Sequence, residues 1–291
     1  MDTTSQNIVQ TGTASRSAMR VATLRAVHHL LDEPIVFDDP IALPILGAQM
    51  AAAMREDPFQ FNDPMSRGLR AAVLARSRFA EEELRKAVQV GVKQYIVLGA
   101  GLDTFAYRNI HAAQGLQVFE VDHPSTQEWK KSLLRDAGIP IPDSMRFAGV
   151  DFESKSLAQG LKDAGFDASQ PAFFSWLGVT LYLTREAIFD TLRFVASLPK
   201  GSAIAFDYGV QRSLLNPIEQ VINEVMGKII GDIGEPWISF FDPALFKSEV
   251  QALGYGSIED LGPEELNLRY FLRRRDGLRT GGGARMMCAK V

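Results

Sequence analysis

The chain has 291 residues, of which 46% are hydrophobic, and carries a formal net charge of -4 at pH 7. This length can bury a large hydrophobic core, and the mild acidity argues against a protein that binds nucleic acid or an anionic membrane surface. No apolar run reaches the roughly 18 residues of a membrane-spanning helix, so we expect a soluble protein.

The beginning of the chain and its cysteine content indicate a cytoplasmic location. Residues 1–16, MDTTSQNIVQTGTASR, are polar and lack the apolar segment of a secretory signal peptide. A single cysteine, Cys288, cannot form an internal disulfide, which fits a reducing compartment.

The N-terminal part of the chain predicts helices and no strands. Residues 1–14 are polar and predict a disordered tail. Between residues 15 and 90 apolar residues recur at helical spacing, and five prolines interrupt the pattern. We expect a helical cap over 15–90 and a ligand-binding α/β core over 91–291, which together form one domain.

From residue 91 onward, short apolar segments alternate with helical patterns. The first segment, within YIVLGAGLDTFAYR (95–108), predicts a strand, a glycine turn and then a helix. The other predicted strands are 116–122, 145–152, 172–177 and 202–208, with helices between them. This alternation is typical of a parallel, doubly wound sheet that is covered by helices on both faces.

The C-terminal part breaks this alternation. After a predicted helix at 243–255, two strand patterns, GSIEDL (256–261) and ARMMCAKV (284–291), are separated by what we expect to be only a loop. We expect these two strands to form an antiparallel pair that closes one edge of the sheet.

Gly99, Ala100 and Gly101 form the turn after the first predicted strand, where a doubly wound sheet binds its ligand. One glycine permits a tight turn and the other allows a close approach to the backbone. A dinucleotide-binding turn would have a third glycine, but Thr104 stands at that position. A simple tight turn with no ligand is the alternative.

Two acidic residues at strand ends add to this candidate site. Asp122 ends the second strand, where a carboxylate can bind the ribose hydroxyls of either a nicotinamide dinucleotide or S-adenosylmethionine. Asp151 ends the third strand, where it can accept a hydrogen bond from an adenine amino group. Either acid alone could equally be a solvated loop residue, but together with the turn they favour a nucleoside site.

Two arginines precede the first strand. A guanidinium can bind the carboxylate of the methionine part of S-adenosylmethionine through two parallel hydrogen bonds. Arg76 and Arg78 cannot share one face of a helix, so we expect only one to reach the ligand. The alternative is that both pair with Glu81 and Glu82 on the surface.

These motifs resemble the S-adenosylmethionine-dependent methyltransferases of the leucine carboxyl methyltransferase family, and in particular their bacterial branch. VLGAGLDTFAYR, VFEVDHP, VDF and FFSWLGVTLYLT are similar to successive family motifs, and LARSRFAEEEL resembles the arginine-bearing helix. The resemblance covers nearly everything from Ser15 onward. It implies the seven-stranded, Rossmann-like methyltransferase sheet and S-adenosylmethionine as methyl donor.

The resemblance also implies roles for particular residues. Asp122 would bind the ribose, with His123 beside it, and Asp151 and Phe152 would lie at the adenine. Gly99 would lie under the methionine part, and Arg76 would hold its carboxylate.

The chain departs from the family in two places. Leu177 stands in the position after the fourth strand where many relatives have a glutamate, which removes a polar contact expected near the methionine amino group. Phe105 stands where arginine is frequent. We therefore do not carry over the protein-carboxyl substrate of the family.

Candidates for catalysis are few. Tyr182 follows the fourth strand and could line the methyl-transfer site, although a core tyrosine is an equal alternative. His123 could act as a base or could order its loop, and Trp237 is one of several aromatic candidates for the acceptor pocket. The spacing of histidine, cysteine and acidic residues indicates no metal site.

We expect a methyltransferase that methylates an oxygen, in a carboxylate or a hydroxyl, of a small molecule. The alternatives are a nicotinamide-dependent dehydrogenase and a nucleoside-binding protein without turnover. The oligomeric state and the acceptor stay open.

Overall fold

The computed structural model describes residues 16–151, 155–232 and 234–291. Within them, the strands are β1 (Gln94–Leu98), β2 (Gln117–Asp122), β3 (Met145–Gly149), β4 (Ala172–Trp176), β5 (Ala203–Val210), β6 (Phe240–Phe241), β7 (Ser257–Leu261) and β8 (Ala284–Lys290). The α-helices are α1 (Arg16–Leu31), α2 (Ala48–Glu56), α3 (Pro64–Gln89), α4 (Pro124–Asp136), α5 (Leu157–Asp163), α6 (Arg185–Ala196), α7 (Pro217–Asp232), α8 (Pro243–Ala252) and α9 (Pro263–Tyr270).

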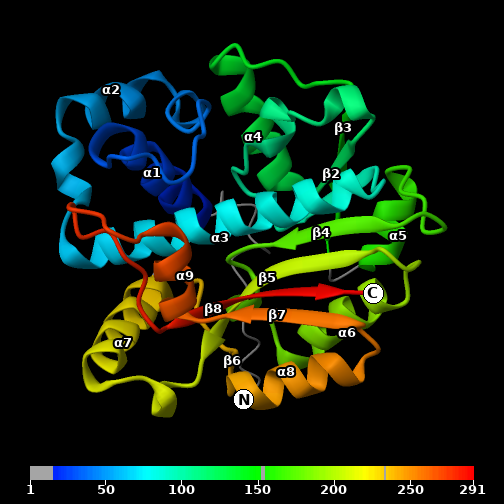
Figure 1. The fold of residues 1–291 in the computed structure, drawn as a ribbon. Coiled ribbons are helices and arrows are strands. Elements are labelled where there is room, and N and C mark those ends of the chain that lie inside the picture. Colours follow the sequence, from blue (N-terminus) through cyan, green and yellow to red (C-terminus); the bar gives the residue numbers. More distant parts are fainter. Residues whose placement is uncertain (1–15, 152–154, 233) are drawn as a thin grey trace, which may run out of the picture.

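The strands form one mixed sheet in the order β3-β2-β1-β4-β5-β8-β7 (Figure 1). β1 to β5 run parallel along this path, and the short β6 pairs with the end of β5. β8 is antiparallel to both β5 and β7. The predicted doubly wound sheet with an antiparallel C-terminal pair is therefore confirmed.

The longest helix of the predicted helical cap is α3, which lies over one face of the sheet (Figure 1). The Asp63 side chain accepts hydrogen bonds from the backbone N–H groups of Met65 and Ser66, and Pro64 occupies the first turn. This arrangement satisfies orphan N–H groups at the start of the helix.

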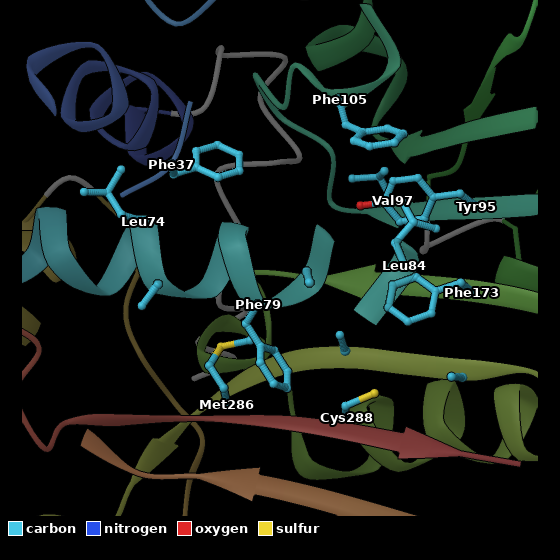
Figure 2. Close-up of a cluster of buried hydrophobic side chains, with 14 of the residues drawn as sticks. Phe37, Leu74, Phe79, Leu84, Tyr95, Val97, Phe105, Phe173, Met286 and Cys288 are labelled. Carbon is cyan, nitrogen blue, oxygen red and sulfur yellow. The ribbon is translucent and has the colours of Figure 1, made fainter. Parts of the chain in front are cut away.

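α3 shares a hydrophobic core with the sheet (Figure 2). Leu74, Phe79 and Leu84 of the helix lie in one cluster with Tyr95 and Val97 of β1. Residues of α5, α6 and α8 pack in a second cluster with the strands. α1 and α2 form a third cluster, which includes Leu134 of α4. The proposed division of the domain at residue 90 stays a prediction.

Two predicted details are wrong. The segment between β7 and β8 is more than a loop, because it contains α9. The segment after the glycine turn forms a single 3₁₀ turn, Phe105–Arg108, in place of a longer helix. Its side chains are held by other elements: Thr104 donates to Asp39, and Arg108 pairs with Glu81 of α3. Tertiary contacts with the N-terminal helices here replace a continued local helix.

Candidate functional site

The turn after β1 needs its glycines. Gly99 and Gly101 have φ values of 64° and 44°, a region that favours glycine. A Cβ on Gly99 would lie 2.4 Å from Cγ2 of Val179, and one on Gly101 would lie 3.1 Å from the Cβ of Ala18. Between them, the buried Ala100 donates its N–H to the carbonyl of Val121 at 3.1 Å. The turn is therefore closely packed between α1 and the loop after β4.

Asp122 connects the tip of β2 to this turn. Its Oδ2 accepts the N–H of Gly101 and its Oδ1 accepts the N–H of His123, each at 2.7 Å. Burial raises the pKa of Asp122 above its usual value, although the two N–H groups oppose this effect. The carboxylate therefore faces the glycine turn. Binding of the ribose by Asp122 stays a prediction.

His123 begins α4. Its Nδ1 accepts the backbone N–H of Ser125 at 3.2 Å, as an N-cap, and lies 2.7 Å from the Ser125 hydroxyl oxygen. This geometry favours the interpretation that His123 orders the loop. Contact with the donor stays a prediction.

The adenine end is described only in part. Asp151 lies two residues beyond the end of β3, next to the tip of β2, and its carbonyl accepts the N–H of Lys155 at 2.8 Å. Phe152 lies outside the described residues. The roles of Asp151 and Phe152 at the adenine stay predictions.

The side chain of Arg76, which comes from α3, lies beside the loop that follows β4. Its Nη1 is 3.1 Å from Oδ2 of Asp207 in β5, and Oδ1 of Asp207 accepts the N–H of Gly178 at 2.6 Å. Gly178 has a φ of 71°, and a Cβ there would lie 2.6 Å from Arg76 Nη2. The guanidinium therefore lies directly against the bare backbone of Gly178, and Asp207 bonds to both.

Arg78 points elsewhere. It pairs with Glu82 at 2.9 Å, donates to the carbonyl of Val36 and lies over the ring of Tyr270. The expectation that the two arginines diverge is confirmed, since only Arg76 reaches the carboxyl edge of the sheet. Binding of the donor carboxylate by Arg76 stays a prediction.

Leu177 does not project into the crevice as a polar group would. It is partly buried and packs against the hydrophobic cluster that includes α3 and β1. Its side chain therefore offers no polar group to the predicted donor site.

Tyr182 ends a short 3₁₀ turn, Thr180–Tyr182, after β4. Burial raises the pKa of Tyr182, which the nearby indole N–H of Trp237, the Ser17 hydroxyl and the charge of Arg76 counteract. The indole N–H of Trp237 is buried and lies near the Tyr182 hydroxyl, but no acceptor among the described residues meets it in good hydrogen-bond geometry. These donors thus converge beside Arg76, on the side of the site that follows β4.

The other aromatic candidates for an acceptor pocket hold the fold together. The Tyr107 hydroxyl lies 3.4 Å from the buried Glu120, which pairs with Lys130 at 2.7 Å. Burial raises the pKa of Glu120 to about 7. The hydroxyl of the fully buried Tyr208 donates to Asp260. These rings are therefore engaged within the core.

Asp207 was not among the predicted site residues. The only signal in the sequence is an acid within the otherwise apolar strand SAIAFDY. Without the register of β4 and β5, that signal cannot be distinguished from a surface position. Among the residues the structure describes, no group of three histidine, cysteine or acidic side chains could hold a metal ion. No described helix is both long and apolar enough to span a bilayer.

A sequence model of the leucine carboxyl methyltransferase family matches residues 18–196. The chain belongs to this family. YktD of Bacillus subtilis, which bears the name of an S-adenosyl-L-methionine-dependent methyltransferase, is 32% identical over 291 residues, covering 91% of this chain and 94% of YktD. A similarly named protein of Mycolicibacterium smegmatis is 32% identical over 231 residues, covering 76% of this chain and 73% of the relative.

Solved structures agree on the fold. A DUF574 family protein of Streptomyces avermitilis has a TM-score of 0.56 at 15% identity, covering 95% of this chain and 97% of that one. A protein of Thermobifida fusca, described as a methyltransferase, has a TM-score of 0.54 at 15% identity, covering 97% and 96%. The shared architecture extends over the whole chain.

Membership in the leucine carboxyl methyltransferase family confirms the predicted enzyme class and the predicted methyl donor. The chain is an S-adenosylmethionine-dependent methyltransferase, and S-adenosylmethionine is its methyl donor. The dehydrogenase alternative is thereby set aside. Two features of the sheet edge fit this donor: the partly buried carboxylate of Asp122 accepts the N–H of Gly101, and the guanidinium of Arg76 lies against the bare backbone of Gly178.

Proposed function

We propose that this methyltransferase methylates a carboxylate oxygen of a small molecule. The observation that carries the proposal is that all four histidines of the chain make local hydrogen bonds, so none of them is placed as a general base. His28 accepts the N–H of Val36, His29 accepts the N–H of Asp39, His111 bonds to Gln114, and His123 caps α4. Each of the chain's four histidines is thus engaged in local structure.

Tyr182 is also a poor base. Because burial raises its pKa, the phenol stays protonated near neutral pH and acts as a donor. The Tyr182 hydroxyl, the Trp237 indole N–H and the positive charge of Arg76 favour an anionic oxygen, whereas the nearby charge of Glu235 opposes it. A carboxylate is already ionised at neutral pH and needs no base.

The donor is itself reactive. When bound, S-adenosylmethionine supplies a methyl group on a positively charged sulfur. The residues of this chain then have to hold donor and acceptor in line and exclude water, which lowers the barrier without proton transfer. In this proposal Asp122 binds the ribose, Arg76 the methionine carboxylate, Asp151 and Phe152 the adenine, and Tyr182 orients the acceptor.

The test is methyl transfer from donor labelled in its methyl group to matched sets of small carboxylic acids, alcohols, phenols and amines. We expect label in the acids, released as methanol by mild alkali, because esters hydrolyse and ethers or methylamines do not. Label that is stable to alkali in every acceptor set would contradict the proposal. Donor binding with no transfer to any set would favour the alternative of a binding protein.

A further inference from the structure

The amino-acid part of the donor carries two opposite charges. A binding site has to satisfy the carboxylate and also the ammonium group, because either one is costly to bury without a partner. Arg76 can take the carboxylate, whereas the glutamate expected after β4 is replaced by Leu177, whose side chain packs into the core. The sequence therefore leaves the ammonium group without an acidic partner.

The sheet brings another acid to this point. β4 and β5 are neighbours in the sheet (Figure 1). They run parallel, and Trp176 lies opposite Phe206. The next pair in this register is Leu177 and Asp207. Asp207 therefore stands on the adjacent strand, directly beside the position that lacks the family acid.

The carboxylate of Asp207 also points toward that position. Its Oδ1 accepts the N–H of Gly178 at 2.6 Å, and its Oδ2 lies 3.1 Å from Nη1 of Arg76. The side chain is 8% exposed. Among the described residues, each oxygen thus has one close donor, and a carboxylate oxygen can accept more than one hydrogen bond.

A second arginine–aspartate pair in the same sheet, Arg285 and Asp260, serves as a comparison because it lies away from the predicted site. Arg285 lies 3.1 Å from Asp260, whose side chain is 5% exposed. There, both carboxylate oxygens also receive the Tyr208 hydroxyl, at 3.1 Å each. The pair at Arg76 instead lies against the bare backbone of Gly178, at the carboxyl edge where this fold binds its ligand.

We propose that Asp207 binds the ammonium group of the methionine part of the donor and replaces the acid that is missing at residue 177. Arg76 and Asp207 form a pair of opposite charges that matches the zwitterion of an α-amino acid. This inference rests on the proposed donor site, because it assigns the carboxylate to Arg76.

The test measures, by isothermal titration, how Asp207→Asn changes the affinity for three ligands. The ligands are S-adenosylhomocysteine, its analogue without the amino group, and 5′-methylthioadenosine, which lacks the whole amino-acid part. The asparagine oxygen can still accept the N–H of Gly178, so the substitution removes mainly the charge. Asp260→Asn is the matched control, since it disrupts an equally short and buried pair away from the predicted site.

We expect Asp207→Asn to weaken S-adenosylhomocysteine binding roughly 10- to 100-fold, as loss of a charged hydrogen bond does. Affinity for the analogue without the amino group should stay within about twofold or improve, because Arg76 loses its competing carboxylate. Affinity for 5′-methylthioadenosine should not change, and Asp260→Asn should leave all three affinities unchanged.

Two results would overturn the inference. If wild-type protein binds S-adenosylhomocysteine and Asp207→Asn binds it equally well, Asp207 does not hold the ammonium group. If the analogue without the amino group weakens as much as S-adenosylhomocysteine, Asp207 acts only by orienting Arg76. Failure of wild-type protein to bind S-adenosylhomocysteine would instead refute the donor site itself.

Discussion

The donor side of the predicted site and the segment between β5 and β6 differ in how deeply their residues are buried. Every residue of β5 is buried, and Asp207 lies within that strand. α7, which follows, buries only Met226 and Ile230 of its 16 residues. Its exposed face carries the apolar side chains of Ile218, Val221, Ile222, Val225 and Ile229.

This contrast distinguishes the predicted donor site from the predicted acceptor site. Residues predicted to hold the donor are positioned by strands whose register the core determines, so their geometry cannot shift without disturbing the sheet. Trp237, on the predicted acceptor side, lies beyond α7 and packs near Gly227 of that helix. If Trp237 lines the acceptor site as predicted, changes in α7 would alter that site and leave the strands at the donor site in place.

Stability gives the largest expected difference between the two regions. Phe206→Ala in β5 should lower the free energy of unfolding by about 3–5 kcal/mol, because it leaves a cavity in the core. Val221→Ala on α7 should change it by less than about 0.5 kcal/mol, since the side chain is 59% exposed. Urea unfolding followed by circular dichroism measures both, and a large loss for Val221→Ala would mean that this face is covered in solution.

Gly178→Ala tests the close approach of Arg76. The new Cβ would overlap the guanidinium, so we expect donor affinity to fall by about 1.5–3 kcal/mol. Strain at positive φ should cost about 1–2 kcal/mol of stability as well. Gly115→Ala is the control, because Gly115 has a φ of 82° but nothing within 4 Å of the added Cβ. It should lower stability alone, and equal donor affinities for the two variants would refute this role.

The two arginines of α3 should differ in the same assay. Arg76→Ala should weaken binding of S-adenosylhomocysteine by about 1.5–3 kcal/mol, the cost of a lost charge-assisted contact. Arg78→Ala should change it by less than about 0.5 kcal/mol, because Arg78 pairs with Glu82 in a partly exposed position. Titration calorimetry compares the two, and the reverse order would show that the wrong arginine was assigned.

The smallest effect concerns pH. A ribose hydroxyl donates a stronger, charge-assisted hydrogen bond to Asp122 while the group is ionised. Burial raises the pKa of Asp122, so protonation begins at higher pH than for an ordinary aspartate. We expect donor affinity to fall about two- to fivefold as the pH is lowered from about 7 to about 5. Asp122→Asn should bind more weakly at about pH 7 and lose this pH dependence. Circular dichroism at both pH values confirms that the protein stays folded, and an unchanged slope in the variant would assign the effect to another group.

The local patterns predicted much of the fold. The alternation of apolar strands with helices and the turn at Gly99 and Gly101 depend on neighbours in sequence. The single 3₁₀ turn after Gly101 was not predictable in this way. It is determined by Asp39 and Glu81, which reach Thr104 and Arg108 from distant parts of the chain.

By itself, the sequence determined the order of the strands along the chain, the glycine turn and the acid that ends β2, because hydrophobic periodicity and backbone freedom are local properties. The tertiary structure decided which arginine reaches the edge of the sheet, and that Asp207 lies beside Leu177. Both depend on the register between β4 and β5 and on how α3 packs across them, and long-range packing sets those relations.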